Sequence, residues 1–233
     1  MLTLEQFKEA RAVLRGVISD TALVHSKYFS ALCGNEVYLK PENLQVTGAY
    51  KIRGAYYKTS KLTDAQKAHG LITASAGNHA QGVAYAAQVA GVKATVVMPT
   101  TTPLMKVNRT KQYGAKVILY GAVFDDAAEY AIKLAQEQHI TYIPPFNDLD
   151  IACGQGTIAY EIFQSLPDVD IILVPIGGGG LAAGVSTLAK LLNPHVKVIG
   201  VEPTGAASMK ASVEAGHIVT LPTAVTIADG VAV

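Results

Sequence analysis

Residues 171–181 read IILVPIGGGGL, and this stretch contains the features that decide the fold. Residues 171–176 are apolar and have the length of a buried strand, and Leu181 opens a run of helical character that continues to residue 192. The four glycines between them leave backbone N–H groups uncovered, and the dipole of the following helix adds positive potential. The stretch therefore predicts a strand, a phosphate-binding turn and a helix, although one or two glycines could also serve a simple tight turn.

The same alternation of short apolar runs and helical patterns extends outward along the chain. Strands are predicted at residues 36–40, 71–74, 94–98, 116–120, 140–143, 171–176 and 196–201. Helical patterns cover residues 4–17, 81–89, 125–138 and 181–192. Strands that are apolar on both faces and alternate with helices predict an α/β fold with mostly parallel sheets flanked by helices.

Two segments look like crossings between two lobes. One is the stretch 141–150 with its Pro144-Pro145 pair, and the other follows Gln45. We therefore expect residues 46–146 to form a smaller inserted lobe, and residues 1–45 and 147–233 to form a larger lobe. A cofactor would lie in the cleft between the lobes, at the carboxyl ends of the strands.

The amino-acid composition indicates which classes of molecule the protein binds. The 233 residues are 50% apolar without a run long enough for a membrane span, and 19 basic residues balance 18 acidic ones. The N-terminal residues mix charges at helical spacing, which is unlike a secretory signal. We expect a cytoplasmic protein that binds small molecules and copies of itself, with no nucleic acid and no membrane as partner. Cys33 and Cys153 are expected to be buried free thiols rather than a disulfide or metal ligands.

Lys51 is the first candidate for chemistry. It lies in residues 40–55, KPENLQVTGAYKIRGA, where Thr47 is expected to cap a helix and small residues leave space beside the lysine. Arg53 is expected to lie nearby and to lower the pKa of Lys51, which favours the neutral amine that reacts with a carbonyl group. Taken alone, a lysine of this kind is more often a solvated surface charge.

A second strand-to-helix turn offers another anion site. The predicted strand 71–74 is followed by residues 75–82, SAGNHAQG, whose backbone N–H groups, Ser75 hydroxyl and Asn78 amide could bind a carboxylate. An ordinary helix cap is the alternative. His79 is more typical of a packed or capping residue than of an acid or base, and the remaining histidines form no pair with the spacing of metal ligands.

The glycine run also fits a different function. Gly177, Gly179 and Ala182 match G-x-G-x-x-A, and Glu202 follows about twenty residues later, as in nicotinamide-dependent oxidoreductases. That alternative leaves Lys51 and residues 75–82 without a role. An amine, a phosphate site and a carboxylate site together favour pyridoxal phosphate chemistry on an amino acid.

The chain resembles the threonine dehydratases (threonine ammonia-lyases) of the tryptophan-synthase-β-like class of pyridoxal-phosphate enzymes, a group that also contains serine racemase. The resemblance is carried by PENLQVTGAYKIRGA, SAGNHAQG and GGGGL, which occur in the order of that family. It implies two lobes with a cofactor cleft between them. It also implies β-elimination on L-threonine, and on serine, with release of ammonia and, from threonine, 2-oxobutanoate.

The same resemblance implies roles for individual residues. Lys51 would bind the cofactor covalently and later take the Cα proton, and Asn78 would contact the phenolic oxygen of the cofactor. The phosphate would be held by the backbone N–H groups of Gly177, Gly178, Gly179, Gly180 and Leu181. The substrate carboxylate would be held by Ser75, Ala76, Gly77 and His79.

Three departures from the family pattern carry further expectations. Ala76 stands where serine racemase has a serine, which predicts elimination rather than racemisation. Glu202 matches one ligand of a divalent-metal site in some relatives, but Ser208 stands where they have an acid, so no metal site is predicted. Family members continue beyond Val233, so the chain resembles a C-terminally shortened form of a dimeric or tetrameric enzyme, with an incomplete large lobe. A cofactor-binding domain without turnover is therefore a third alternative.

Overall fold

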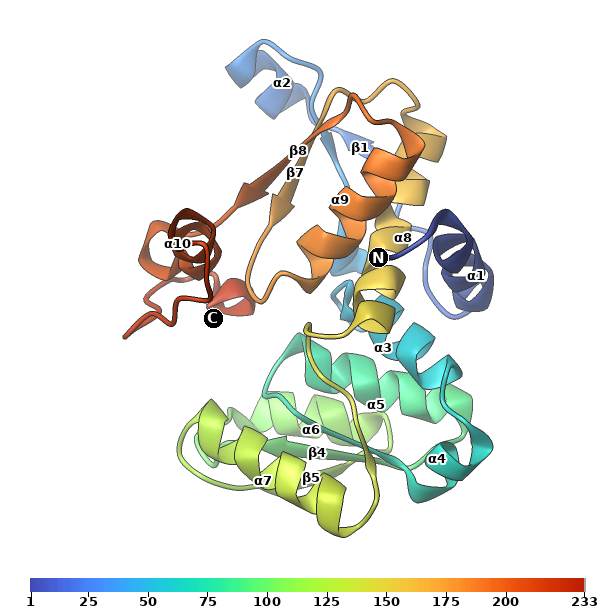
Figure 1. Ribbon diagram of the computed structural model, residues 1–233, viewed down its shortest axis with the longest axis vertical. Helices are drawn as coiled ribbons and strands as arrows, with labels where there is room; N and C mark the ends of the chain where they lie inside the picture. The colour runs from blue at the N-terminus through green and yellow to red at the C-terminus, as the bar shows by residue number, and fades with distance from the viewer. Residues whose placement is uncertain (233) are drawn as a thin grey trace.

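The computed structural model, which describes residues 1–232, alternates helices and strands along the chain (Figure 1). The α-helices are α1 (Leu4–Leu14), α2 (Lys27–Cys33), α3 (Lys51–Ser60), α4 (Asp64–His69), α5 (Asn78–Ala90), α6 (Leu104–Gln112), α7 (Phe124–Glu137), α8 (Leu149–Ser165), α9 (Gly180–Leu192) and α10 (Ser208–Ala215). The strands are β1 (Val24–His25), β2 (Tyr38–Leu39), β3 (Leu71–Ala74), β4 (Ala94–Met98), β5 (Lys116–Leu119), β6 (Thr141–Tyr142), β7 (Ile171–Pro175) and β8 (Lys197–Val201). Short 3₁₀ turns, η1 to η3, cover Glu42–Leu44, Thr204–Ala206 and Asp229–Val231.

A four-stranded parallel sheet has the order β5-β4-β3-β6. Its central strands are buried on both faces, because Leu71 and Val96 pack in one cluster with α5, while Ile72 and Val97 pack in another with α7. Helices α5 and α7 therefore cover opposite faces of the sheet (Figure 1). All four positions of β3 are buried, and only Thr73 among them is polar.

A second parallel sheet is the pair β7 and β8, in register from Ile171↔Lys197 to Pro175↔Val201. One face of β7 packs Ile172 and Val174 into a cluster shared with α1, α8 and α9. The other face leaves Ile171 50% and Leu173 65% exposed. The alternation of buried and exposed positions is that of a sheet covered on one side.

Helix α8 lies between α3 and α9 at backbone contact distance. A Cβ atom on Gly184 of α9 would lie 1.9 Å from the carbonyl oxygen of Ala152, and one on Gly154 would lie 2.6 Å from the Cα atom of Gly54 in α3. Real Cβ contacts are never so short, so only glycine fits at these crossings. At these two crossings the helix backbones therefore lie in direct contact.

The α/β fold and the parallel sheets are confirmed, and each predicted strand from residue 71 onward is observed within two residues of its predicted ends. The predicted strand 36–40 is reduced to β2, which pairs antiparallel with the unpredicted β1. Helix α8 was also not predicted, because its two glycines and its β-branched residues give a weak helical propensity. Cys153 is buried as expected, whereas Cys33 is exposed, so that part of the prediction is wrong. No helix within residues 1–232 is both long enough and apolar enough to cross a membrane.

We expect Gly184→Ala to lower the free energy of unfolding by about 2 kcal/mol or more, because the added methyl group overpacks the α8–α9 crossing. Helix propensity alone would predict the opposite sign, a gain of about 1 kcal/mol. Urea unfolding measures the difference, with Gly230→Ala as the control, since a Cβ at Gly230 meets nothing within 4 Å. A stabilised Gly184→Ala protein would show that the crossing is not tightly packed.

Candidate active site

Lys51 is the first residue of α3, and its side chain is half-buried. Its Nζ donates a hydrogen bond of 2.8 Å to the carbonyl oxygen of Pro145 and lies 5.6 Å and 5.9 Å from the ring centroids of Tyr50 and Phe146. The helix start lacks the expected cap: the N-cap residue is Tyr50 without a side-chain bond, and the Thr47 hydroxyl points to the carbonyl of Ala49 instead. The amine thus lies between the adjacent Tyr50 ring and two residues far away in sequence, Pro145 and Phe146.

Burial lowers the pKa of Lys51 to about 8. The expectation that Arg53 causes this shift is wrong. The Arg53 guanidinium is completely buried and bonded to the carboxylates of Glu42 and Glu161, which neutralise its charge. Desolvation, rather than a neighbouring cation, therefore prepares a neutral amine at Lys51.

The titratable side chains beside Lys51 are uncharged near neutral pH. Burial raises the pKa of Tyr50 to about 12. Burial, and secondly the charge of Lys51, lowers the pKa of His79 to about 3. The neutral His79 donates from Nε2 to the carbonyl of Ile143 at 3.0 Å, so it is packed, as predicted, and unsuited to proton transfer.

The segment of residues 143–148, here called the crossing segment, connects β6 to α8 and touches each motif. The carbonyl of Ile143 accepts hydrogen bonds from Thr73 and His79, and the carbonyl of Pro145 accepts one from Lys51. The ring of Phe146 covers the glycine run. Sequence reasoning missed these contacts because backbone carbonyls bind irrespective of residue type.

The loop of residues 75–77 lies at the end of β3 and is half-buried, Ala76 included. The Ser75 hydroxyl accepts a hydrogen bond of 3.2 Å from the Gly77 amide. Helix α5 then begins at the exposed Asn78 without a side-chain cap, so the amides of its first turn have no acceptor from the cap residue. A Cβ on Gly82, one turn further on, would lie 3.2 Å from the carbonyl carbon of Lys51, so this helix start packs directly beside the lysine.

The glycine run follows β7 and begins α9. Gly179 is the N-cap with φ 85° and offers no side-chain acceptor, so the amides of Gly180 and Leu181 are free to bind an anion. A Cβ on Gly178 would lie 2.3 Å from the ring of Phe146. An open cavity of about 530 Å³ borders this run, lined by Gly178, Gly179, Gly180, Phe146, Met209 and their neighbours.

These features fit a phosphorylated cofactor. Uncapped amides at the start of α9 suit a phosphate. The missing Cβ atoms of Gly178 and Gly180 make room for Phe146 instead. The structure brings Lys51 beside the start of α5, and it links the lysine to the glycine run through Phe146. Gly177 lies half-buried between β7 and Gly178.

Glu202 is engaged elsewhere. Its carboxylate accepts hydrogen bonds from the amides of Met209 and Lys210, at 2.9 and 2.8 Å, and so caps the start of α10, where Ser208 is the first residue. This arrangement gives no support to a ribose-binding role, and the nicotinamide alternative loses its acidic residue. In residues 1–232 no three His, Cys, Asp or Glu side chains are grouped so that they could hold a metal ion.

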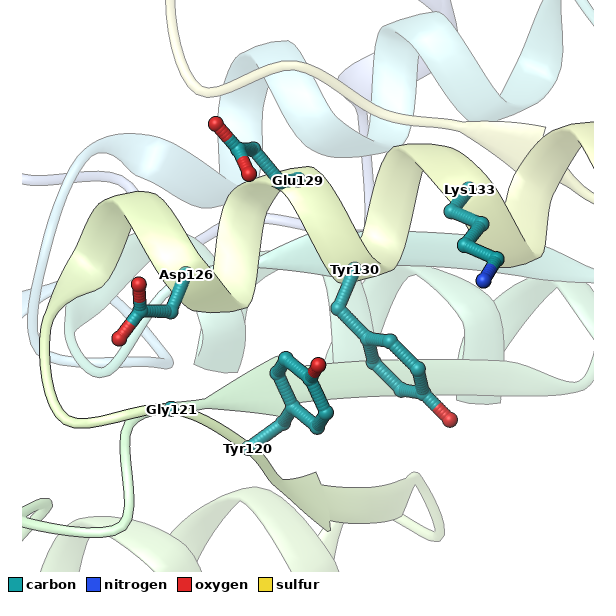
Figure 2. Close-up of a pocket in the computed structure, with 6 residues that line it drawn as sticks. All are labelled: Tyr120, Gly121, Asp126, Glu129, Tyr130 and Lys133. Atoms are coloured by element: carbon teal, nitrogen blue, oxygen red, sulfur yellow. The ribbon is translucent and has the colours of Figure 1, made fainter.

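A second hollow, of about 410 Å³, lies on α7 and the end of β5, away from these motifs (Figure 2). It is lined by Tyr120, Gly121, Asp126, Glu129, Tyr130 and Lys133. The rings of Tyr120 and Tyr130 stack with centroids 4.0 Å apart, and Asp126 accepts hydrogen bonds from backbone amides. None of the predicted site residues lines this hollow.

Comparison with known proteins gives consistent matches. The family described as pyridoxal-phosphate dependent enzyme matches residues 14–233. The L-threonine ammonia-lyase of Thermotoga maritima is 49% identical over 233 residues, which are 100% of this chain and 58% of that protein. The chain therefore spans little more than half the length of this relative.

Comparison with solved structures also finds a threonine deaminase and a serine racemase. The processed form of threonine deaminase isoform 2 from Solanum lycopersicum has a TM-score of 0.95 and 44% identity, with 98% of this chain and 63% of that chain covered. Maize serine racemase has a TM-score of 0.95 and 37% identity, with 98% and 70% covered. These matches confirm the resemblance to threonine dehydratases and the choice of cofactor. The chain belongs to the family of pyridoxal-phosphate-dependent enzymes.

Proposed function

We propose that this chain is, or is part of, a pyridoxal-phosphate-dependent ammonia-lyase that converts L-threonine to 2-oxobutanoate and ammonia and also acts on L-serine. The observation that carries the proposal is the buried amine of Lys51, whose pKa is about 8, beside the uncapped start of α5 and, through Phe146, the uncapped start of α9. The names of the similar proteins support it, since they are threonine ammonia-lyases and a threonine deaminase.

Separate groups of residues would bind the cofactor and the substrate. Bound pyridoxal phosphate would withdraw electrons from the Cα atom of the amino acid. The amides of Gly177, Gly178, Gly179, Gly180 and Leu181 would hold the phosphate, and Asn78 would donate to the phenolic oxygen. The substrate carboxylate would bind the turn formed by Ser75, Ala76, Gly77 and the backbone amide of His79.

Lys51 would hold the cofactor through its aldehyde and, once the substrate amine has displaced it there, would take the Cα proton on the freed Nζ. Near pH 8 a large fraction of this amine is neutral, as a base must be. His79 would not replace it, because its pKa is about 3 and its Nε2–H is bonded to Ile143. The Pro145 carbonyl would orient the amine.

We also propose that residues 46–146 form the smaller lobe and residues 1–45 and 147–233 the larger one. The four-stranded sheet supports this division, because all its strands lie within residues 71–142. A second candidate function is cofactor binding without turnover. Cofactor uptake without release of ammonia from threonine would distinguish it.

An assay of ammonia and 2-oxoacid release over a panel of β-hydroxy amino acids, with added pyridoxal phosphate, tests the proposal. We expect turnover of threonine and serine, and a loss of at least about 10³-fold in Lys51→Ala, because the base and the cofactor attachment are both removed. Lys133→Ala, which removes an exposed lysine of α7, is the control. Release that is equal in Lys51→Ala would refute the role of Lys51.

The pH dependence of acetylation tests the protonation state of the Lys51 amine. Since the pKa of Lys51 is lowered to about 8, the rate of its acetylation by trace acetic anhydride should be half-maximal near pH 8. A model lysine peptide should require pH values above about 10, since its amine stays protonated up to there. Peptide mass spectrometry measures the modified fraction at Lys51. A midpoint equal to that of the model peptide would mean that Lys51 is not desolvated.

Serine racemisation should be far slower than serine deamination. A racemase needs a proton donor on the face opposite Lys51, and Ala76 cannot transfer a proton. Chiral chromatography of serine, run beside the 2-oxoacid assay, gives both rates. Comparable rates would contradict this role of Ala76.

A further inference from the structure

Four charged side chains form a group that the proposed reaction does not use: the buried Arg53 and the half-buried Lys40, Glu42 and Glu161, here called the charge cluster. Arg53 is 0% exposed and forms a two-point contact with Glu42, with Nε and Nη2 each 2.8 Å from a carboxylate oxygen. It forms a second such contact with Glu161, at 2.5 and 2.9 Å. Lys40 also pairs with Glu161.

The charge cluster is balanced and fully bonded. Two positive charges face two negative charges, and the hydroxyls of Thr21 and Thr157 complete the hydrogen bonds, at 2.6 Å to Glu42 and 3.2 Å from Arg53. Burial alone would lower the pKa of Arg53, but the two carboxylates raise it overall. Burial opposes ionisation of Glu161, yet Arg53 lowers the pKa of this carboxyl. Arg53 and Glu161 therefore stay charged.

The cluster closes the loop that carries Lys51. Glu42 lies in η1, before the loop, and Arg53 lies in the first turn of α3, after it. The Glu42–Arg53 pair thus joins the two ends of the loop. Glu161 of α8 pairs with Arg53 after the loop and with Lys40 before it. No side chain caps the start of α3, and the loop turns through Gly48 with φ 74°. Gln45 restrains the first part of the loop through two hydrogen bonds of 2.8 Å with the Ser19 backbone, and Arg53 restrains the opposite end, next to Lys51.

Buried ion pairs contribute little net stability compared with well-packed apolar residues, because desolvation offsets the attraction. Two-point contacts to a planar guanidinium instead fix the relative positions of the groups that they join. We propose that Arg53, Glu42 and Glu161 are positioning residues that clasp this loop and hold the Lys51 amine at the Pro145 carbonyl, where it reacts with the cofactor aldehyde. The inference rests on the proposed function only in the identity of that aldehyde.

The test measures covalent capture of pyridoxal phosphate by the complete chain. The Lys51 nitrogen bonds to the aldehyde carbon, water leaves, and borohydride reduces the product so that mass spectrometry can count it at Lys51. We compare Glu161→Gln and Arg53→Lys with the matched control Asp150→Asn. Asp150 also pairs α8 with α3, through Lys58 at 2.9 Å, but seven residues beyond Lys51.

In Glu161→Gln and Arg53→Lys we expect capture at Lys51 to slow about tenfold, because a small displacement of a reacting group costs this much or more. The pH midpoint of capture should rise above 8, because a released loop lets water reach the amine. Asp150→Asn should keep its rate within about twofold and its midpoint unchanged. Circular dichroism confirms that each protein is folded.

The positioning role would be overturned if both variants captured pyridoxal phosphate at the wild-type rate and pH midpoint. It would also be overturned if Asp150→Asn lost as much of the capture rate as they do. If neither variant folds, Thr157→Val decides. It removes one acceptor of Arg53, so capture should slow about two- to threefold, and an unchanged rate would overturn the proposal. Lys51→Ala separates the positioning role from the proposed function. If the Lys51→Ala protein still captures as much pyridoxal phosphate at its other lysines, the proposed function is refuted rather than the positioning role.

Discussion

Backbone contact between α8 and its two neighbours is the constraint on which the rest of the structure depends. Gly154 lets α8 touch α3, and Gly184 lets α9 touch α8. Lys51 begins α3, and the glycine run begins α9. A single central helix therefore sets the positions of both the amine and the phosphate-binding amides, and a displacement of α8 would change the site at two places together.

The crossing segment positions the individual groups of the site. It binds Lys51 through a carbonyl oxygen, binds His79 through another and covers Gly178 with the ring of Phe146. The result is an uncharged environment in which desolvation alone lowers the pKa of the lysine. Such an amine needs no neighbouring cation, which leaves Arg53 free to serve the structure.

The alternation of apolar strands and helices was sufficient to predict the α/β fold, since strands such as β3 and β4 are apolar except for one threonine in each. The motifs around Lys51, Asn78 and the glycine run were recognisable because their chemistry resides in residue type and order. Helix α8 could not be predicted from propensity, because Gly154 and Gly156 serve packing between helices. The role of Arg53 was wrongly predicted because proximity in sequence does not reveal which carboxylates a guanidinium meets.

The two ends of α3 differ in their sensitivity to ionic strength. At its start, Arg53 is completely buried, and dissolved ions screen such a pair only weakly. At its far end, Lys61 pairs with Glu9 through side chains that are 39% and 48% exposed, and salt weakens such a contact. High salt would thus loosen the helix at the end remote from Lys51 and leave the amine where the charge cluster holds it.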